Sequence, residues 1–420
     1  MRPARRSRRV PSARHLVAVA AGAVLVAGCS PGGGDGGSAA EPVAAPTGAP
    51  SGTASAGASP GASPAPSGSG PRTVTFVATG DVLLHEPLWE QARRDAGGSG
   101  SGGGRMDFAP MLAAIKPVVS GADLALCHLE TPLAPPGGPY AAYPSFSSPP
   151  QVLAALKATG YDACTTASNH TFDKGAAGVD RTIEELDAAG LAHAGSYRSA
   201  AESRRTTIVT AAGVRVAILS YADGFNGNAS PGGDEWRANV IDTDRILADA
   251  RAARRRGAQI VITALHWGTE YRHEPDERQR TVAPRLARSR DVDLVIGHHA
   301  HVVQPVERIG RTWVVYGLGN LLAWHTTPVP DNAEGLLVRF TFTQGAGGRF
   351  AVTRAEYDPL LVARDAPIRL LDVPAALATS SYGSSTKARL RTALNRTTTV
   401  VTSRGATKEG LQPLVRPPTP

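Results

Sequence analysis

Five short apolar runs in this chain each end directly in residues that can bind a metal ion or carry a proton. The runs and the polar residues behind them are 74–79 before Asp81, 123–127 before His128 and Glu130, 161–167 before Asn169, His170 and Asp173, 259–265 before His266 and Glu270, and 292–296 before His298, His299 and His301. Runs of this length and composition predict buried β-strands. Scattered surface histidines would show no such regularity, so the pattern indicates one shared site.

Helical segments lie between these runs. Residues 151–159 stop at Gly160, residues 179–189 stop at Gly190, and residues 246–256 stop at Gly257, with Asp242 or Thr243 as the candidate N-cap. Strands that alternate with such helices predict βαβ units and a largely parallel sheet. In open sheets of this kind, ligands bind beyond the carboxyl ends of the strands, where the polar clusters would converge.

Three pairs of strand-like runs flank glycine-containing turns and predict additional antiparallel strands. The pairs are 206–210 with 214–221, 305–309 with 312–316, and 336–343 with 349–356. The predicted fold class is therefore α/β, a sandwich of two mixed β-sheets with helices outside. We place the globular domain at residues 73–371, a workable length for one large α/β domain, and expect residues 372–420 to form a weakly ordered tail rich in Thr, Ser and Arg.

Residues 1–29 have the composition of a bacterial lipoprotein signal peptide. Six arginines precede the apolar run 16–27, which is too short to span a bilayer as a mature helix. The run ends in Leu25-Val26-Ala27-Gly28-Cys29, which resembles a lipobox, whose cysteine is lipidated. An ordinary signal peptide with a chance cysteine is the alternative, but the chain has only 3 cysteines. We expect an extracytoplasmic protein that is lipid-anchored at Cys29 to the bacterial cell membrane.

Residues 30–72 consist almost entirely of Gly, Ser, Ala, Pro and Thr, without an aromatic residue. Such a segment cannot bury enough apolar surface to offset its ordering entropy, so we expect a disordered tether. The formal net charge is +8, but removing the six leader arginines from the 44 basic residues leaves 38 against 36 acidic residues, or about +2. Charge therefore does not indicate a nucleic-acid partner.

Two further cysteines, Cys127 and Cys164, fall within apolar strand-like runs. We interpret them as buried free thiols. An oxidising compartment also allows a disulfide between them, but sequence alone cannot show that they are close in space.

The polar clusters contain the side chains that bind transition metals in proteins. Imidazoles and carboxylates bind Zn, Mn or Fe, and the amide oxygen of Asn169 can complete such a set. His299 and His301 lie on the same side of an extended segment, because side chains repeat with period two. A surface pair is the alternative, but three of the chain's 11 histidines directly follow one predicted buried strand. We therefore expect at least one of His299 and His301 to bind a divalent ion.

These clusters together resemble the CapA family, the poly-γ-glutamate capsule biosynthesis proteins, whose domain is similar to calcineurin-like metallophosphoesterases. The resemblance rests on Thr79-Gly80-Asp81-Val82, Leu129-Glu130-Thr131-Pro132, Ser168-Asn169-His170-Thr171-Phe172-Asp173-Lys174-Gly175, His266-Trp267-Gly268-Thr269-Glu270-Tyr271, Gly297-His298-His299-Ala300-His301-Val302-Val303-Gln304 and Tyr316-Gly317-Leu318-Gly319-Asn320. The motifs occur in the family's order and cover residues 74–320. They imply the calcineurin-like metallophosphoesterase sandwich.

The resemblance also implies roles for individual residues. Asp81 and His301 would bind a first metal, and Asn169, His266 and His299 a second, with Glu130 in the place of the bridging carboxylate. His170 would assist the leaving group, and Asp173 would orient it. The candidates for substrate contact are Glu270, Tyr271 and Asn320.

Four positions depart from the expected pattern. The Asp-x-His of the phosphoesterases is absent, and the nearest histidine is His85. Glu130 replaces a typical aspartate. His128 stands where the capsule family usually shows asparagine, and Ala300 where it usually shows proline. The first two departures make a single metal an alternative to a metal pair.

Two classes of function fit the resemblance. The first is a metal-dependent hydrolase or transferase that acts on an extracytoplasmic phosphoester or an amide-linked acidic polymer. The second is a non-catalytic accessory protein that binds, exports or anchors poly-γ-glutamate with a degenerate phosphatase-like site. The many imidazoles favour the first class, and the missing Asp-x-His favours the second. In both, the expected partners are an anionic cell-surface polymer or phosphoester and other capsule synthesis or export proteins.

Overall fold

The computed structural model describes residues 70–97, 105–228, 230–325 and 329–416. The predicted leader with Cys29, and the predicted tether up to residue 69, lie outside these described residues. Within the described ranges, no helix is both long and apolar enough to cross a membrane.

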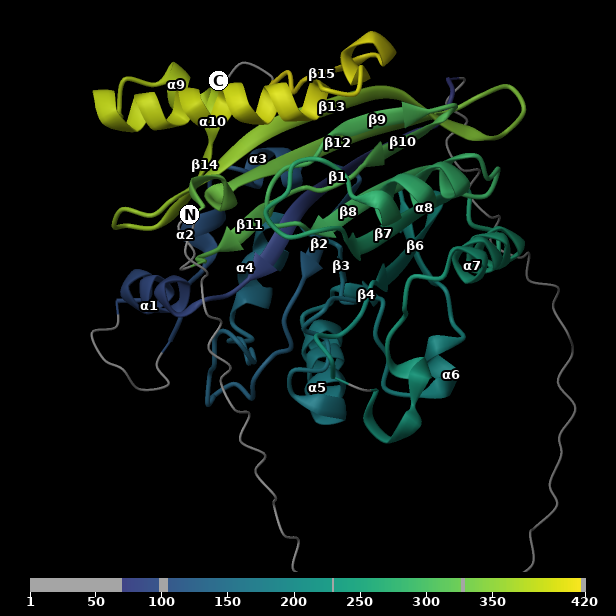
Figure 1. Cartoon of the computed structure of the whole chain (residues 1–420), viewed down its shortest axis with the longest axis horizontal. Helices are drawn as coiled ribbons and strands as arrows, with labels where there is room; N and C mark the ends of the chain where they lie inside the picture. The colour runs from purple at the N-terminus through teal and green to yellow at the C-terminus, as the bar shows by residue number, and fades with distance from the viewer. Residues whose placement is uncertain (1–69, 98–104, 229, 326–328, 417–420) are drawn as a thin grey trace, which may run out of the picture. The chain divides into compact units, whose positions relative to one another are not determined.

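Two mixed β-sheets form the centre of the described structure (Figure 1). In the first sheet the strand order is β14 (Arg369–Asp372), β13 (Phe350–Ala363), β12 (Glu334–Gln344), β1 (Thr73–Leu83), β2 (Leu124–Leu129), β3 (Ala163–Thr165) and β4 (Ala192–Ala194), with β11 (Asn320–Ala323) paired to β1 and β15 (Leu411–Pro413) paired to β13. In the second sheet the order is β5 (Thr207–Ala211), β6 (Val214–Ala222), β7 (Ile260–Trp267), β8 (Leu294–His299), β10 (Thr312–Val315) and β9 (Val306–Ile309). Strands β1 to β4 run parallel, as do β6, β7, β8 and β10.

Helices cover the outer faces of both sheets. On the first sheet lie α1 (Glu86–Asp95), α2 (Ala109–Leu112), α3 (Lys116–Val119) and α4 (Val152–Thr159), and on the second lie α7 (Thr243–Arg255) and α8 (Glu277–Ala287). The remaining helical segments are α5 (Gly175–Ala188), α6 (Ala200–Ser203), α9 (Val373–Ala378), α10 (Ser384–Thr402) and the short 3-10 turns Pro231–Gly233, Glu235–Arg237, Pro330–Ala333 and Ala406–Glu409.

Alternation along the strands divides the apolar side chains between layers. On β1, Phe76 packs between the two sheets, whereas Val77 packs against the helices, because successive strand residues point to opposite faces. Ile262 of β7 joins Phe76 in the inter-sheet core, and Val261 faces α7 and α8. The predicted two-sheet sandwich with flanking helices is confirmed.

The predicted elements between the motifs are also confirmed. The three hairpins form as β5 with β6, β9 with β10 and β12 with β13. Asp242 caps α7 by accepting hydrogen bonds from the backbone N–H groups of Asp244 and Arg245. Helix α4 ends at Gly160, whose φ of 114° lies in the left-handed region that glycine tolerates.

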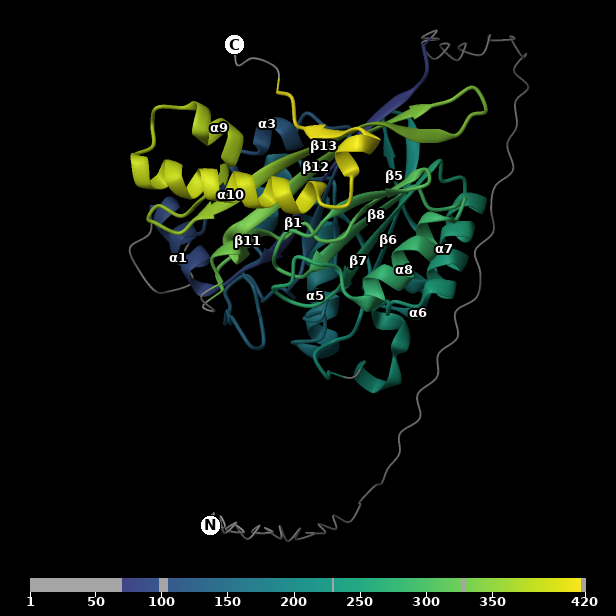
Figure 2. The ribbon, with the colours of Figure 1, turned by 45° about the horizontal axis from the view of Figure 1, so that its top comes forward.

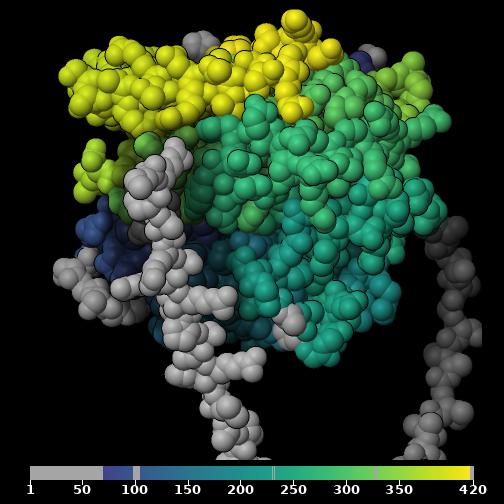
Figure 3. Space-filling model, in the orientation of Figure 1, coloured from purple at the N-terminus to yellow at the C-terminus, as the bar shows by residue number. Residues whose placement is uncertain are grey.

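The prediction of a weakly ordered tail after residue 371 is wrong for the described part. Helices α9 and α10 pack across β13 and β12 (Figure 2), and the C-terminal segment forms a continuous layer on one side of the molecule in Figure 3. Leu390, Ala393, Thr397 and Val401 are buried at helical spacing on α10. Because α10 is rich in threonine, its composition alone does not reveal this narrow row of buried residues.

Ion pairs hold the same helix in place. Arg389 and Arg396 of α10 both reach the buried carboxylate of Glu334, at 2.6 and 2.7 Å. This attachment adds to the apolar packing of α10 against β13.

The interpretation of Cys127 and Cys164 as free thiols is also wrong, because they form a disulfide. The two residues are register partners on the neighbouring parallel strands β2 and β3. The bond therefore joins two strands whose carboxyl ends carry polar site residues.

Removing this disulfide is expected to destabilise the domain. The bond spans 37 residues, and restricting an unfolded loop of that size stabilises a protein by about 2–4 kcal/mol. The double variant Cys127→Ala/Cys164→Ala should lose that amount in the free energy of unfolding, measured by urea denaturation beside the oxidised wild type. Equal stability of the two proteins would show that the bond does not constrain the unfolded chain.

Candidate functional site

The ends of parallel strands from both sheets meet at one place. Asp81 on β1 is the register partner of His128 on β2, and His266 on β7 is the partner of His298 on β8. Glu130 directly follows β2, and Asn169 follows β3. The convergence expected from the sequence is therefore observed in the structure.

The backbone at this place adopts rare conformations. Among the described non-glycine residues with positive φ are His299 (89°), His301 (54°), Tyr271 (61°) and Asn226 (52°), and all four lie at or beside the cluster. Such conformations cost of order 1–3 kcal/mol each and persist where the surrounding structure holds them, often at functional sites. Gly80 permits another close approach, since a Cβ there would lie 2.1 Å from the carbonyl oxygen of Gly319.

The two buried carboxylates differ in their surroundings. Asp81 Oδ1 lies 2.8 Å from His298 Nδ1, and Oδ2 accepts the backbone N–H of His299 at 3.2 Å. Burial alone would raise the pKa of Asp81, but its contacts with His298 and His301 hold that pKa well below its usual value. Neither oxygen of Glu130 has a hydrogen-bond partner among the described residues, and burial raises the pKa of Glu130 well above its usual value.

The imidazoles surround Glu130. His301 Nε2 lies 3.6 Å from Glu130 Oε1, and His266 Nε2 lies 3.9 Å from the same oxygen. Burial lowers the pKa of His266 well below its usual value and lowers that of His299 to about 4. Burial also acts to lower the pKa of His301, but Glu130 and Asp81 outweigh it and raise that pKa to about 9. His266 and His299 are therefore neutral near pH 7, the form that binds metals.

Four groups of side chains have ligand atoms within 4.8 Å of one another. The groups are Asp81 with Glu130 and His301, Glu130 with His266 and His299, Glu270 with His299 and His301, and Asp81 with His128 and His298. The first two contain the residues that the family resemblance implies as ligands of the first and the second metal, apart from Asn169, and they share Glu130. Asn169 lies beside the second, with Oδ1 at 2.9 Å from His266 Nε2.

The donor set fits a divalent transition metal. Both oxygens of Glu130 and Nδ1 of His299 are buried without a hydrogen-bond partner in the described structure. Leaving such atoms unpaired costs about 1–3 kcal/mol each, and more for a charged group. An ion of Mn, Zn or Fe would satisfy these atoms, since imidazole nitrogen and carboxylate oxygen are ligands for all three.

His170 and Asp173 form a pair beside the cluster. His170 Nδ1 lies 2.7 Å from Asp173 Oδ2, and the same oxygen accepts the backbone N–H of Phe146 at 2.8 Å. The ring of Phe146 meets His170 edge-on, with 4.7 Å between the ring centroids. Asp173 therefore holds the imidazole from one side, as the sequence implies.

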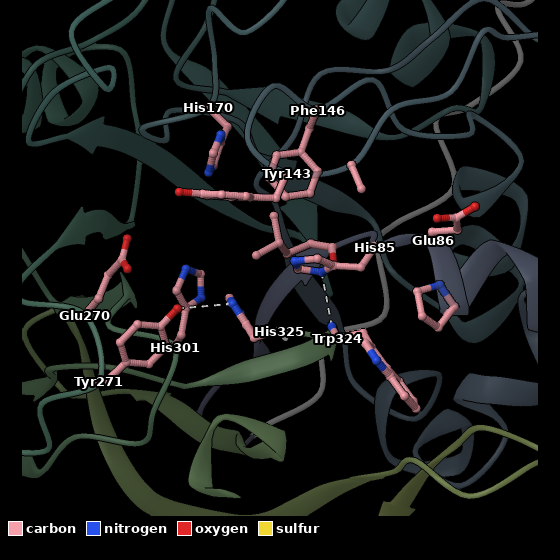
Figure 4. A pocket seen from close by; sticks show the side chains of 13 residues that line it. His85, Glu86, Tyr143, Phe146, His170, Glu270, Tyr271, His301, Trp324 and His325 are labelled. Atoms are coloured by element: carbon pink, nitrogen blue, oxygen red, sulfur yellow. Dashed lines mark hydrogen bonds between the residues drawn. The ribbon is translucent and has the colours of Figure 1, made fainter. Parts of the chain in front are cut away.

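A cavity of about 540 Å³ opens in front of these residues (Figure 4). Its lining includes His170, His301, Glu270 and Tyr271. Glu270 and Tyr271, two of the three candidates for substrate contact, therefore face the cavity. Asn320 is different: it is buried and its Oδ1 lies 3.0 Å from His301 Nδ1. The structure thus places Asn320 behind His301, out of the cavity lining, and corrects its candidacy for substrate contact.

Four further histidines belong to the site, although the sequence assigns them no role. His128 and His298 lie in the buried cluster, and His85 and His325 line the cavity. The ring centroid of His325 lies 4.5 Å from that of His301 and 5.0 Å from that of His85. The period-two alternation of β1 could have found His85, which lies two residues beyond Leu83. Nothing in the sequence points to His325.

The fold is an α/β sandwich, and buried carboxylates and imidazoles gather at its strand ends. Together these features describe a protein with a candidate metal centre. Residues 75–324 match the family described as bacterial capsule synthesis protein PGA_cap, and the chain belongs to that family. The predicted resemblance is confirmed.

Similar proteins include the PGA biosynthesis protein CapA of Bacillus subtilis, which is 29% identical over 47% of this chain and 51% of its own length. The capsule biosynthesis protein CapA of Bacillus anthracis is 28% identical over 42% of this chain and 43% of its own. A probable polyglutamine synthesis accessory protein of Mycobacterium tuberculosis is 26% identical over 51% and 57%. The chain thus spans about half the length of the curated relatives that it matches.

Solved structures with a similar arrangement include a calcineurin-like phosphoesterase of Bacillus subtilis, with a TM-score of 0.44 and 14% identity over 78% of this chain and 98% of that one. A 5′-nucleotidase precursor of Thermus thermophilus has a TM-score of 0.41 and 16% identity over 69% and 54%.

Proposed function

We propose that this chain is a membrane-anchored, extracytoplasmic member of its family that acts in the synthesis of a capsule or another cell-surface polymer through a metal-dependent hydrolase- or transferase-type site. One observation carries the catalytic part of the proposal. Two candidate metal-binding sets share Glu130 and lie beside the His170–Asp173 pair at an open cavity.

Each part of the site has a distinct task in this proposal. Divalent ions held by the two sets would polarise a phosphoryl or carbonyl oxygen and activate water. Asp173 accepts the Nδ1–H of His170, so His170 Nε2 is the nitrogen left for the substrate, and Figure 4 shows the ring pointing into the cavity. A proton on Nε2 can pass to the leaving group. Asn320 supports His301 from behind.

The substrate class follows from the relatives' names and the site. One relative is named a PGA biosynthesis protein and another a capsule biosynthesis protein. We therefore propose an anionic polymer or a phosphoester as substrate. Its reacting group would lie at the two candidate metal-binding sets that share Glu130, and a neighbouring group would lie in the cavity.

The alternative is an accessory protein that binds, exports or anchors the polymer without turnover. The missing Asp-x-His motif favours this alternative, as does the name of the mycobacterial relative. One experiment separates the two. The full-length chain, loaded with Mn²⁺ or Zn²⁺, is incubated with poly-γ-glutamate and with a chromogenic phosphodiester. Hydrolysis of either supports the enzyme, whereas retention of the polymer without cleavage supports the accessory protein.

The membrane anchor is tested separately at Cys29. Because the proposed lipid is attached through its thiol, Cys29→Ser should move the protein from the membrane fraction to the medium, as seen by immunoblotting of cell fractions. Cys127→Ser/Cys164→Ser, which alters the other two cysteines, should stay with the membranes. If the Cys29 variant also stays there, the anchor proposal fails.

A further inference from the structure

A chain of hydrogen bonds runs behind the proposed metal ligand His266. His266 Nδ1 lies 2.9 Å from His128 Nε2, and His128 Nδ1 lies 2.8 Å from Thr165 Oγ1. Thr165 Oγ1 in turn reaches the backbone carbonyl of Cys127 at 3.4 Å. The rings of His128 and His266 and the side chain of Thr165 are all almost fully buried, so these contacts are shielded from water.

At its other end the chain reaches Asn169. His266 Nε2 lies 2.9 Å from Asn169 Oδ1. The orientation of this amide is set by its nitrogen, because Asn169 Nδ2 donates to Asn226 Oδ1 at 3.2 Å. The atom that faces His266 is therefore an acceptor.

A neutral imidazole carries one hydrogen, so each ring donates at one nitrogen and accepts at the other. Without a cation, His266 Nε2 must carry the hydrogen, because two acceptors would otherwise face each other at Asn169 Oδ1. His266 Nδ1 then accepts from His128 Nε2–H, and His128 Nδ1 accepts from the hydroxyl of Thr165. Every contact from Thr165 to Asn169 is satisfied with the hydrogens pointing toward Asn169, and Thr165 gives up only its 3.4 Å contact with the carbonyl of Cys127.

A metal ion at the second set requires the opposite direction. His266 Nε2 can bind a cation only with its lone pair free, which moves the ring hydrogen to Nδ1. His266 Nδ1–H must then donate to His128 Nε2, so His128 carries its hydrogen on Nδ1 and donates to Thr165 Oγ1. The hydroxyl of Thr165 then donates a hydrogen bond to the carbonyl oxygen of Cys127. All contacts from His266 Nδ1 to Cys127 are satisfied in this direction.

We propose that His128 is a positioning residue for His266, and that the hydrogen-bond chain from His266 through His128 to Thr165 reverses direction when a divalent ion binds. This inference rests on the proposed metal site. It assigns His128 a role that the sequence motifs do not give it. An imidazole suits this position because it can donate or accept at the nitrogen that faces His266. An outer partner that fixes the tautomer of a ligand typically contributes roughly 10–100-fold to metal affinity.

The structure also offers a competing role, since His128 forms a possible ligand set with Asp81 and His298. In that case a nitrogen of His128 would bind the ion itself. Substitution distinguishes the roles. His128→Gln keeps a donor and an acceptor at about the reach of Nε2, whereas His128→Leu keeps only the apolar bulk.

The test uses the full-length chain in detergent, with ¹⁵N-labelled histidine, first treated with a chelator and then titrated with Zn²⁺. Nitrogen-detected spectra should show His266 and His128 both changing from the Nε2–H to the Nδ1–H tautomer. Zn²⁺ affinity should fall roughly 10–100-fold in His128→Leu and stay within a few-fold of wild type in His128→Gln. His193→Leu, on β4 outside the cluster, should bind like wild type.

Two outcomes would overturn the inference while leaving the proposed metal site in place. One is Zn²⁺ binding to His266 with no change in the His128 tautomer. The other is a metal-bound shift on a His128 nitrogen together with equal losses in the Gln and Leu variants. If the wild-type chain binds no Zn²⁺ at all, the proposed metal site fails and the inference fails with it.

Discussion

His266→Ala is expected to remain folded and to lose nearly all divalent-metal affinity of the set that His266 forms with Glu130 and His299. His266 provides an imidazole to the set with Glu130 and His299. Losing only the outer support of such a ligand costs roughly 10–100-fold, so losing the ligand itself should cost more. The double variant His299→Ala/His301→Ala removes a ligand from each set and should behave in the same way. Metal content after dialysis, measured by mass spectrometry, reads out the effect, and circular dichroism checks the fold.

The loss should also appear in stability. An ion present at about 1,000 times its dissociation constant stabilises the folded state by about 4 kcal/mol. Wild type should show that gain on adding metal, and His299→Ala/His301→Ala, which lacks a ligand of each set, should not. His193→Ala is the matched control, because His193 lies on β4 and contacts Asp187 at 3.3 Å instead of the cluster. Full metal retention in both the His266 and the His299/His301 variants would contradict the metal site.

His170→Ala is expected to abolish turnover while leaving metal content nearly intact. The ring is held by Asp173 at 2.7 Å and lines the cavity, but it belongs to none of the four candidate ligand groups. A positioned general acid typically contributes about 10²–10⁴-fold to the rate, so kcat should fall by that factor.

Asp173→Asn gives an independent check on this pair. The amide can still accept the hydrogen bond from His170 Nδ1, but it lacks the charge that stabilises a protonated ring. Its kcat should therefore fall less than that of His170→Ala, with unchanged metal content. If His170→Ala loses its metal, His170 is part of the metal site. If its kcat equals that of wild type, His170 is not the acid.

The strand ends were predictable from the sequence because buried strands have a recognisable length and composition. In the sequence, Asp81, Glu130 and His266 each come after such an apolar run, and parallel strands bring their carboxyl ends together. These regularities depend only on backbone geometry. They located most of the cluster without any knowledge of side-chain contacts.

His298 follows one of the predicted strands but was given no role, because the period-two rule assumes an extended backbone. That rule puts His299 and His301 on one side and His298 on the other. In the structure, His299 and His301 have positive φ, and His298 Nδ1 lies 2.8 Å from Asp81 Oδ1. The bent backbone therefore brings all three rings to the same site, which no periodicity could show.

Other errors have a common cause in long-range contacts. The pairing of Cys127 with Cys164 depends on the register between β2 and β3, which is set by the whole sheet. The order of the C-terminal segment depends on burial of α10 against β13 and on Glu334, a partner far away in the sequence. Local composition shows neither the register between β2 and β3 nor the contacts of α10 with β13 and Glu334.

The most direct measurement is anomalous diffraction from crystals of the full-length chain grown with Mn²⁺ or Zn²⁺, recorded at the absorption edge of the metal. We expect at least one anomalous peak at ligand distance from Glu130, together with His266 and His299 or with Asp81 and His301. Peaks at both sets would establish the metal pair, and one peak would establish the single-metal alternative. A saturated crystal with no peak within ligand distance of Glu130 would contradict the proposed site.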